Sequence, residues 1–242
     1  MTKKKVAQVS SPAGESVPSA NSTRGRLVAA ALAAFCAASF DGVSVRNIER
    51  QAGVERGLVA YHFGSKQKLW NEAVDSVFNP YFEEMTSLSD ALRDVSPGER
   101  GRALTMAYVR FNARHPELFK LLVLEGLTRT ERTERLESHL RRARVLFHGM
   151  IGLRETNDID ELIQMYLVLG AAGTPFALSA YREPALGGSA PGAMSVHDPA
   201  FVERFARAVA AIAVPRVHHR DEPTPQRQPG AQRTEHAVDH RG

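Results

Sequence analysis

A short basic stretch in the N-terminal third of the chain combines side chains whose donors could bind base edges and anions. Arg56 carries a planar fork of five N–H donors, which matches the O6 and N7 acceptors of guanine in a major groove. Gly57 follows it and would let the backbone approach a base closely. Lys66 comes directly after Ser65, where free N–H groups at a helix start would bind phosphate beside the ammonium group. This chemistry predicts a contact with DNA.

Two short helices are expected to position these groups. The first runs from Ser44 to Ala52, with Ser44 as its N-cap, and the second from Glu55 to about His62. Gly53 between them suits a backbone of positive φ. Helices so short and so tightly joined cross steeply, which is the helix-turn-helix arrangement whose second helix enters a major groove.

Longer helices are expected on both sides of this motif. Residues Arg24 to Phe40 carry an apolar stripe with helical spacing, which predicts a helix that supports the two short ones. Ser65 is expected to cap a helix that continues to about Phe78, where Asn79-Pro80 should kink or end it.

These residues resemble the N-terminal domain of the TetR family of bacterial ligand-responsive repressors. The resemblance covers that domain and says nothing about individual residues of the rest of the chain. The points of agreement are Val45-Arg46-Asn47-Ile48, Ala52-Gly53-Val54, Gly57-Leu58-Val59, Tyr61-His62-Phe63-Gly64-Ser65-Lys66 and Leu69.

The resemblance implies roles for individual residues of the stretch. Tyr61 and His62 match family positions that contact phosphate, although Tyr61 could instead pack on the domain. Leu58 could face either a thymine methyl group or the small core of the domain. Ala60 stands where the family often has an aromatic residue, so that contact is not expected here. The predicted DNA-binding set is Arg46, Arg56, Gly57, Leu58, Ala60, Tyr61, His62 and Lys66, with Arg24 as a further candidate for a phosphate contact.

The distribution of charge agrees with this prediction. The whole chain carries a net charge of +4. Between Arg24 and Trp70 there are seven Lys or Arg residues and three acids, whereas acids slightly outnumber bases from Asp75 to Val214. A positive excess that lies mainly in the predicted reading segment and the extreme N-terminus is typical of phosphate binding.

The pattern as a whole predicts an all-α protein with a larger helical domain after the DNA-binding domain. We expect a disordered basic arm over residues 1–20, a DNA-binding domain over 21–81 with its motif at about 44–63, a helical effector-binding and dimerisation domain over 82–214, and a disordered tail over 215–242. Ser96 is expected to cap one of the helices after Pro80. The candidates are Tyr81–Val95, Pro97–Arg114, Glu117–Leu127, a helix from Thr130 or Glu131 to about Leu153, Asp158–Tyr181 and Asp198–Val214.

The last two of these helices could pair two copies of the chain. They carry apolar surface and small residues, and the TetR resemblance implies a four-helix bundle between subunits. The same faces could instead complete the core of one monomer. A homodimer with heads about 34–36 Å apart, or a multiple of that, would recognise a palindromic operator.

The resemblance also implies a cavity for a small, hydrophobic effector whose binding changes the distance between the two heads. For each candidate lining residue, ordinary core packing is the favoured alternative: Phe78, Phe82, Phe111, Phe119, Phe147, Met165, Tyr166 and Phe176. His115, His139 and His148 match no metal motif, so neither a metal nor another cofactor is expected.

Composition restricts the remaining alternatives. No apolar run approaches the ~18–20 residues of a membrane span, so no membrane partner is expected. A single cysteine cannot form an internal disulfide, which fits the cytoplasm. No phosphate loop, nucleophile elbow or paired-histidine zinc motif supports an enzyme acting on small hydrophobic substrates. The main rival is a constitutive DNA-binding dimer without an effector.

Overall fold

The computed structural model describes residues 22–127, 129–151, 159–178 and 195–213. These residues form helices and no strand, which confirms the predicted all-α fold class. The predicted N-terminal arm and C-terminal tail lie outside the described residues. The helices are α1 (Thr23–Ala38), α2 (Val45–Gln51), α3 (Leu58–Phe63), α4 (Lys66–Ala91), α5 (Pro97–Arg114), α6 (Glu117–Glu125), α7 (Glu131–Ile151), α8 (Ile159–Ala177) and α10 (Pro199–Ala213).

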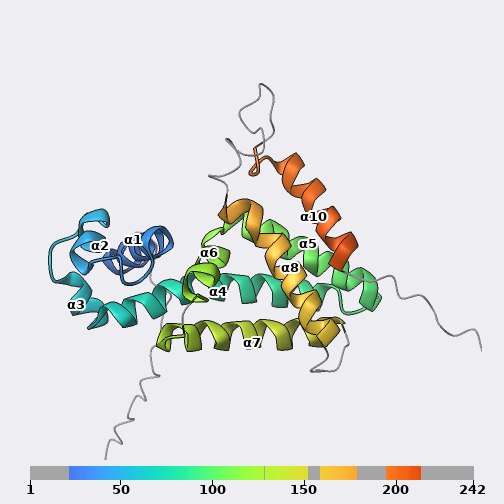
Figure 1. Ribbon diagram of the computed structural model, residues 1–242, viewed down its shortest axis with the longest axis horizontal. Helices are drawn as coiled ribbons and strands as arrows, with labels where there is room; N and C mark the ends of the chain where they lie inside the picture. Colours follow the sequence, from blue (N-terminus) through green and yellow to red (C-terminus); the bar gives the residue numbers. More distant parts are fainter. Residues whose placement is uncertain (1–21, 128, 152–158, 179–194, 214–242) are drawn as a thin grey trace, which may run out of the picture.

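Helix α4 joins two groups of helices (Figure 1). Helices α1 to α3 lie together at its N-terminal end, and we call them, with the first two turns of α4, the head. The other helices and the rest of α4 form the body, in which α7 runs beside α4 and both α8 and α10 contact α5. No helix among the described residues is long and apolar enough to cross a membrane.

The head is built around a group of buried, mainly apolar side chains. Leu27 and Phe35 of α1, Ile48 of α2, Val59 of α3 and Trp70 of α4 each expose 1% or less of their surface. Helices of six or seven residues are marginal in isolation, so this shared core is what stabilises α2 and α3.

Three serine N-caps form as the sequence predicts. The Oγ atoms of Ser44, Ser65 and Ser96 accept hydrogen bonds from backbone N–H groups three residues ahead, at 3.1, 3.2 and 3.4 Å. A serine cap typically stabilises a helix by about 1 kcal/mol. The positions of these three serines therefore set where α2, α4 and α5 begin.

Helix α4 does not end where the sequence predicts. It continues through Pro80 to Ala91, so of the two predicted alternatives, a kink or an end, the end is wrong. The expected separate helix Tyr81–Val95 is largely the second half of α4. A proline inside a helix costs about 3 kcal/mol. Phe78 and Phe82 flank it and are buried in the core. Burial of each contributes about 1.5–3 kcal/mol, which is enough to offset the proline.

The second short helix begins three residues later than predicted. The sequence predicts a start at Glu55, but α3 begins at Leu58, and Arg56 lies in the turn before it. Gly57 adopts a left-handed backbone with φ 95°, which is incompatible with a helix interior. Gly53 has φ 63°, as its predicted role at the end of the first helix requires. Two glycines with positive φ therefore lengthen the turn.

The head and the body share one continuous apolar core. Phe35 of α1 and Phe78 of α4 belong to the same buried cluster as Phe111 of α5 and Leu118 of α6. The Cys36 thiol also donates to the Glu117 carbonyl of α6 at 3.8 Å. Any change of head position must therefore rearrange packed side chains in the body.

Candidate nucleic-acid interface

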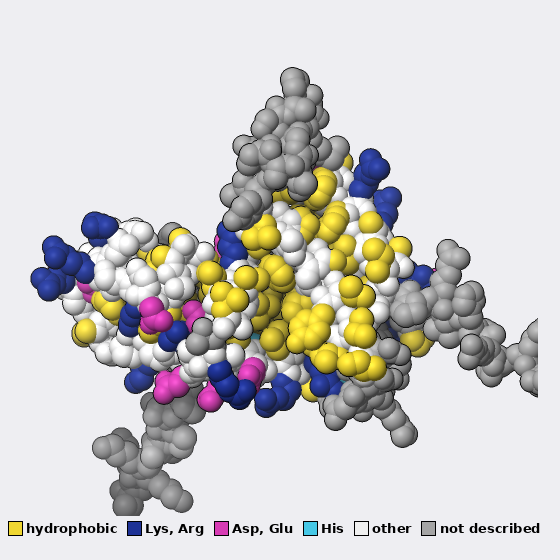
Figure 2. Space-filling view, viewed as in Figure 1, with side chains coloured by type: hydrophobic (Ala, Val, Ile, Leu, Met, Phe, Trp, Pro, Cys, Tyr) yellow, Lys and Arg dark blue, Asp and Glu magenta, His cyan; other side chains and the backbone are white. Residues whose placement is uncertain are grey.

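Three residues of the predicted DNA-binding set form an exposed tip on α2, α3 and the turn between them. Arg46 and Arg56 are exposed, and Tyr61 exposes 80% of its surface. Figure 2 shows lysine and arginine side chains gathered at this end of the molecule. The exposure of Tyr61 argues against the alternative that it packs on the domain.

The other predicted residues of α3 and of the turn before it divide between the surface and the core. Gly57 and Ala60 are exposed, and His62 is half-buried with its ring 5.0 Å from that of Tyr61. Leu58 is half-buried and packs against the head core. Of its two alternatives, this packing favours the core.

Lys66 is not free in the way the sequence predicts. Its ammonium group donates to the backbone carbonyl of Phe40 and lies 4.1 Å from the centroid of the Phe40 ring. Burial holds the pKa of Lys66 below its ordinary value, while Asp41 raises it and Arg132 lowers it. To reach a phosphate, the side chain would have to leave Phe40. Its role in DNA binding therefore stays a prediction.

Arg24 is also held within the protein. Its guanidinium group pairs with Glu72 of α4 at 2.7 Å and lies 5.2 Å from the centroid of the Phe63 ring. Both contacts join α1 to the helices that follow the turn. The structure therefore gives Arg24 a packing role beside the candidate phosphate contact.

One residue important for the geometry of the tip is missing from the predicted set. Glu49 of α2 is buried, and its carboxylate accepts hydrogen bonds from backbone N–H groups at the start of α3. The sequence contains a signal for such a partner, because Gly57 has no side chain with which to cap the helix that follows it. It does not indicate which residue supplies the acceptor.

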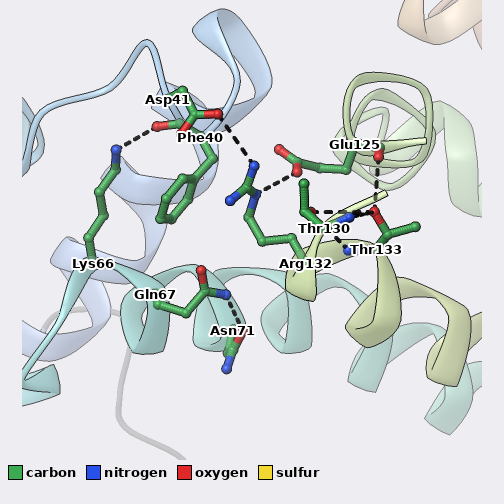
Figure 3. Close-up of polar contacts among 9 residues, drawn as sticks. All are labelled: Phe40, Asp41, Lys66, Gln67, Asn71, Glu125, Thr130, Arg132 and Thr133. Carbon is green, nitrogen blue, oxygen red and sulfur yellow. Dashed lines mark hydrogen bonds and ion pairs between the residues drawn. The ribbon is translucent and has the colours of Figure 1, made fainter. Parts of the chain in front are cut away.

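The loop after α1 connects the head to the body through Phe40. Figure 3 shows the Phe40 ring between Lys66 of α4 and Arg132 of α7. Arg132 lies 4.2 Å from the ring centroid, bonds to Glu125 at 2.7 Å and pairs with Asp41 at 3.5 Å. We call Phe40, Asp41, Lys66, Glu125 and Arg132 the junction.

The predicted effector-pocket residues do not come together in one place. Phe78, Phe82 and Phe111 belong to the core shared with the head, whereas Phe176 belongs to a second cluster and Phe147 packs against a third. Phe119 is buried with its ring against the backbone of Gly173. Met165 and Tyr166 expose 36% and 63% of their surface on α8.

An open groove of about 820 Å³ runs between α4, α5 and α10. None of the eight predicted pocket residues lines it. Two ion pairs cross it, from Arg110 to Glu203 at 2.8 Å and from Arg114 to Glu84 at 2.7 Å. Its arginines are therefore already neutralised by carboxylates of neighbouring helices.

Histidines of the body make protein contacts. The Nε2 atom of His139 lies 2.9 Å from an oxygen of Asp75, and its ring stacks on Phe78 at 4.4 Å. His115 packs against Phe111 at 4.5 Å, and His148 is buried. Within the described part of the chain, no group of three or more His, Cys, Asp or Glu side chains is placed to bind a metal ion.

The outward surface of α8 is strongly apolar. Its exposed large side chains are Ile159, Leu162, Ile163, Met165, Tyr166 and Leu167, and Ile212 on α10 is also exposed. Figure 2 shows apolar side chains gathered over this part of the body. Of the small residues of α8, Ala172 and Gly173 face the protein interior, whereas Ala171 is exposed.

Comparison with known proteins identifies the N-terminal region. Residues 27–73 match the family model for bacterial regulatory proteins of the tetR family. The HTH-type transcriptional repressor NicS of Pseudomonas putida is 28% identical over 108 residues, which cover 45% of this chain and 50% of that protein. The chain thus matches about half the length of this curated relative.

Solved structures share the fold over most of this chain at low sequence identity. The transcriptional regulator FadR from Bacillus subtilis, in complex with stearoyl-CoA, has a TM-score of 0.57 and 14% identity, covering 80% of this chain and 98% of that one. A TetR/AcrR-family regulator from Thermobifida fusca has a TM-score of 0.51 and 20% identity, covering 77% and 96%. Residues 27–73, which include the exposed helix-turn-helix tip, are thus similar to bacterial regulatory proteins of the tetR family.

Proposed function

We propose that this protein is a repressor that binds a palindromic operator as a homodimer and releases it when a small hydrophobic molecule occupies the body. The observation that carries the proposal is the exposed basic tip formed by Arg46, Arg56 and Tyr61. The repressor NicS is 28% identical over 108 residues, which supports repression over activation. We place this function in the cytoplasm, where the protein would meet DNA.

In this proposal the tip reads DNA through α3 and the turn before it. Arg56 would contact a guanine, and Gly57 to Ala60 would form the rest of the base-reading surface. Arg46, Tyr61 and His62 would bind phosphates, which fix the register without reading sequence. The capped start of α4 offers backbone N–H groups to a further phosphate, whether or not Lys66 leaves Phe40.

The apolar face of α8 supports a homodimer. Isolated apolar side chains are normal on a surface, but a contiguous set marks an interaction site. A second copy of the same face would cover it through an isologous contact and would hold two heads at a fixed separation. Helix α10 would take part through Ile212, which is exposed on the same domain.

A ligand in the body would act on the head through packed contacts. We propose a DNA-binding domain over 21–81 and an effector and dimerisation domain over 82–214, joined by the continuous helix α4. The junction gives a second connection, because Arg132 and Glu125 belong to the body while Phe40 and Asp41 belong to the head. A ligand shifts such an equilibrium only by its difference in affinity between the two states.

Two other functions are distinguished from this one by the test below. A constitutive DNA-binding dimer would have the same tip and the same dimer face but no effector. An enzyme acting on small hydrophobic substrates would need a set of reacting groups, and no observation on the described residues favours one over the regulator.

The proposal is tested with the full chain and a pool of random DNA duplexes. We expect selection to enrich a palindrome whose half-site centres are about 34–36 Å apart, or a multiple of that. Failure to enrich any sequence would overturn the DNA-binding proposal. Bound operator would then be titrated with hydrophobic small molecules, beginning with stearoyl-CoA. Release by one of them supports a ligand-responsive repressor, whereas retention with all of them favours the constitutive dimer.

A further inference from the structure

The helix that would read DNA has no cap of its own. Helix α3 has six residues, and its N-cap position is Gly57, which has no side chain to accept a hydrogen bond. The first N–H groups of any helix lack partners within the helix and need acceptors from elsewhere. A helix of fewer than two turns depends strongly on such partners because few internal bonds hold it.

Glu49 of α2 supplies the missing acceptor. Its Oε1 atom accepts hydrogen bonds from the backbone N–H of Gly57 at 2.9 Å and of Val59 at 3.0 Å. Its backbone carbonyl also accepts from Val54 in the same turn at 3.1 Å. One residue therefore accepts hydrogen bonds from two backbone N–H groups of the turn and from one in the first turn of α3.

Charge and burial both strengthen this contact. A carboxylate interacts favourably with the N-terminal end of a helix, and hydrogen bonds to a charged acceptor are stronger than neutral ones. Only 4% of the Glu49 surface is exposed, so the bonds are shielded from water. Leaving buried backbone donors without a partner would cost more than the bonds themselves contribute.

We propose that Glu49 is a positioning residue for DNA reading, which caps α3 from the neighbouring helix and thereby sets the direction in which Arg56 and α3 point. The proposal rests on the proposed function, in which this tip meets a major groove. Arg56 directly precedes Gly57, so its backbone is fixed by the same bonds. Glu49 itself stays inside the head and contacts no DNA.

The first test is hydrogen exchange of backbone amides in the full-length protein without DNA. Glu49→Ala should raise the exchange rate of the Gly57 and Val59 amides by about tenfold, the effect of losing a helix cap. Amides of α1 and α5 should stay at wild-type rates. Glu49→Gln retains an acceptor oxygen and should restore slow exchange. Glu55→Gln is the matched control, because Glu55 is an exposed acid in the same turn.

Several results of this experiment would overturn the proposal. Unchanged exchange at Gly57 and Val59 in the alanine variant would show that the carboxylate does not hold the turn. A uniform increase over the whole protein would show a general structural role instead of a local one. Exchange as fast in Glu49→Gln as in the alanine variant would exclude the acceptor oxygen as the cause.

The second test measures DNA discrimination with the operator selected by the wild-type protein. Glu49→Ala should reduce the ratio of specific to random-sequence affinity by about tenfold and leave the salt dependence of non-specific binding unchanged. Glu49→Gln should recover most of the ratio. An unchanged ratio in the alanine variant overturns the positioning role. If the wild-type protein selects no operator, the function has failed, while the exchange test still decides whether Glu49 caps α3.

Discussion

The guanidinium group of Arg132 lies over the ring of Phe40, with 4.2 Å between Cζ and the ring centroid. These residues come from α7 and from the loop after α1, so the contact fastens the body to the head. Arg132 is held in place by Glu125, which is 5% exposed and bonds to it at 2.7 Å. The guanidinium group that packs on Phe40 is therefore also one partner of a buried ion pair.

Removing Arg132 should destabilise the protein strongly. Arg132→Ala leaves the carboxylate of Glu125 buried without its partner, which typically costs about 3–5 kcal/mol. Urea denaturation of the full chain measures the loss. Arg129→Ala is the control, because Arg129 is 79% exposed and lies 4.0 Å from Glu137, so its loss should change stability by less than about 1 kcal/mol. Equal stability of the two variants would show that the junction contributes little.

Replacing Arg56 should relax the sequence preference of the protein. Arg56→Ala is expected to cost about 1–3 kcal/mol on the cognate operator and to weaken discrimination at one base position. Fluorescence anisotropy with operators altered one base pair at a time measures this. Arg46→Ala should instead weaken binding to all sequences about equally. An unchanged preference in the Arg56 variant would contradict its assignment to a base.

Two roles of Lys66 can be separated by experiment, namely phosphate binding and packing on Phe40 in the junction. If Lys66 leaves Phe40 and binds a phosphate, Lys66→Ala should reduce the slope of log affinity against log salt by about one unit. Lys68→Ala, an exposed lysine of the same helix turn, serves as the control. An unchanged slope with a lower stability would place Lys66 in the junction only.

Gly173 should be essential for the packing of α8 on α6. A Cβ atom at this position would lie 2.3 Å from the Phe119 ring and 2.7 Å from its Cβ, so the side chain cannot swing away. Gly173→Ala should therefore destabilise the protein by about 1–3 kcal/mol in thermal or urea unfolding. Gly170→Ala is the control, since a Cβ there meets nothing within 4 Å and alanine favours a helix. Similar effects of the two changes would contradict the packing argument.

A charge on the outward face of α8 should separate the proposed dimer. Tyr166→Glu removes an aromatic contact and should raise the dissociation constant at least about thirtyfold, the effect of losing a hot-spot residue. Sedimentation velocity over a range of concentrations measures this. Val145→Glu is the control, because Val145 is similarly exposed but lies on α7. A dimer that persists in the Tyr166 variant would place the partner surface elsewhere.

The sequence by itself determines most of the helices and the identity of the reading tip. Ser44, Ser65 and Ser96 cap helices in the structure as predicted, because a cap depends on residues only three positions away. The positive φ of Gly53 is equally local. The exposure of Arg56 and Tyr61 follows because a polar or amphipathic side chain beside a tight turn finds little core to enter.

Only the tertiary structure decides where distant residues meet. Helix α4 passes Pro80 because buried phenylalanines on both sides outweigh a local penalty, and that balance is invisible in the local pattern. Glu49 reaches donors up to ten positions away, and Arg132 pairs with Asp41 across 91 positions. Such contacts depend on how packed helices orient their side chains. The periodicity of one helix does not contain that information.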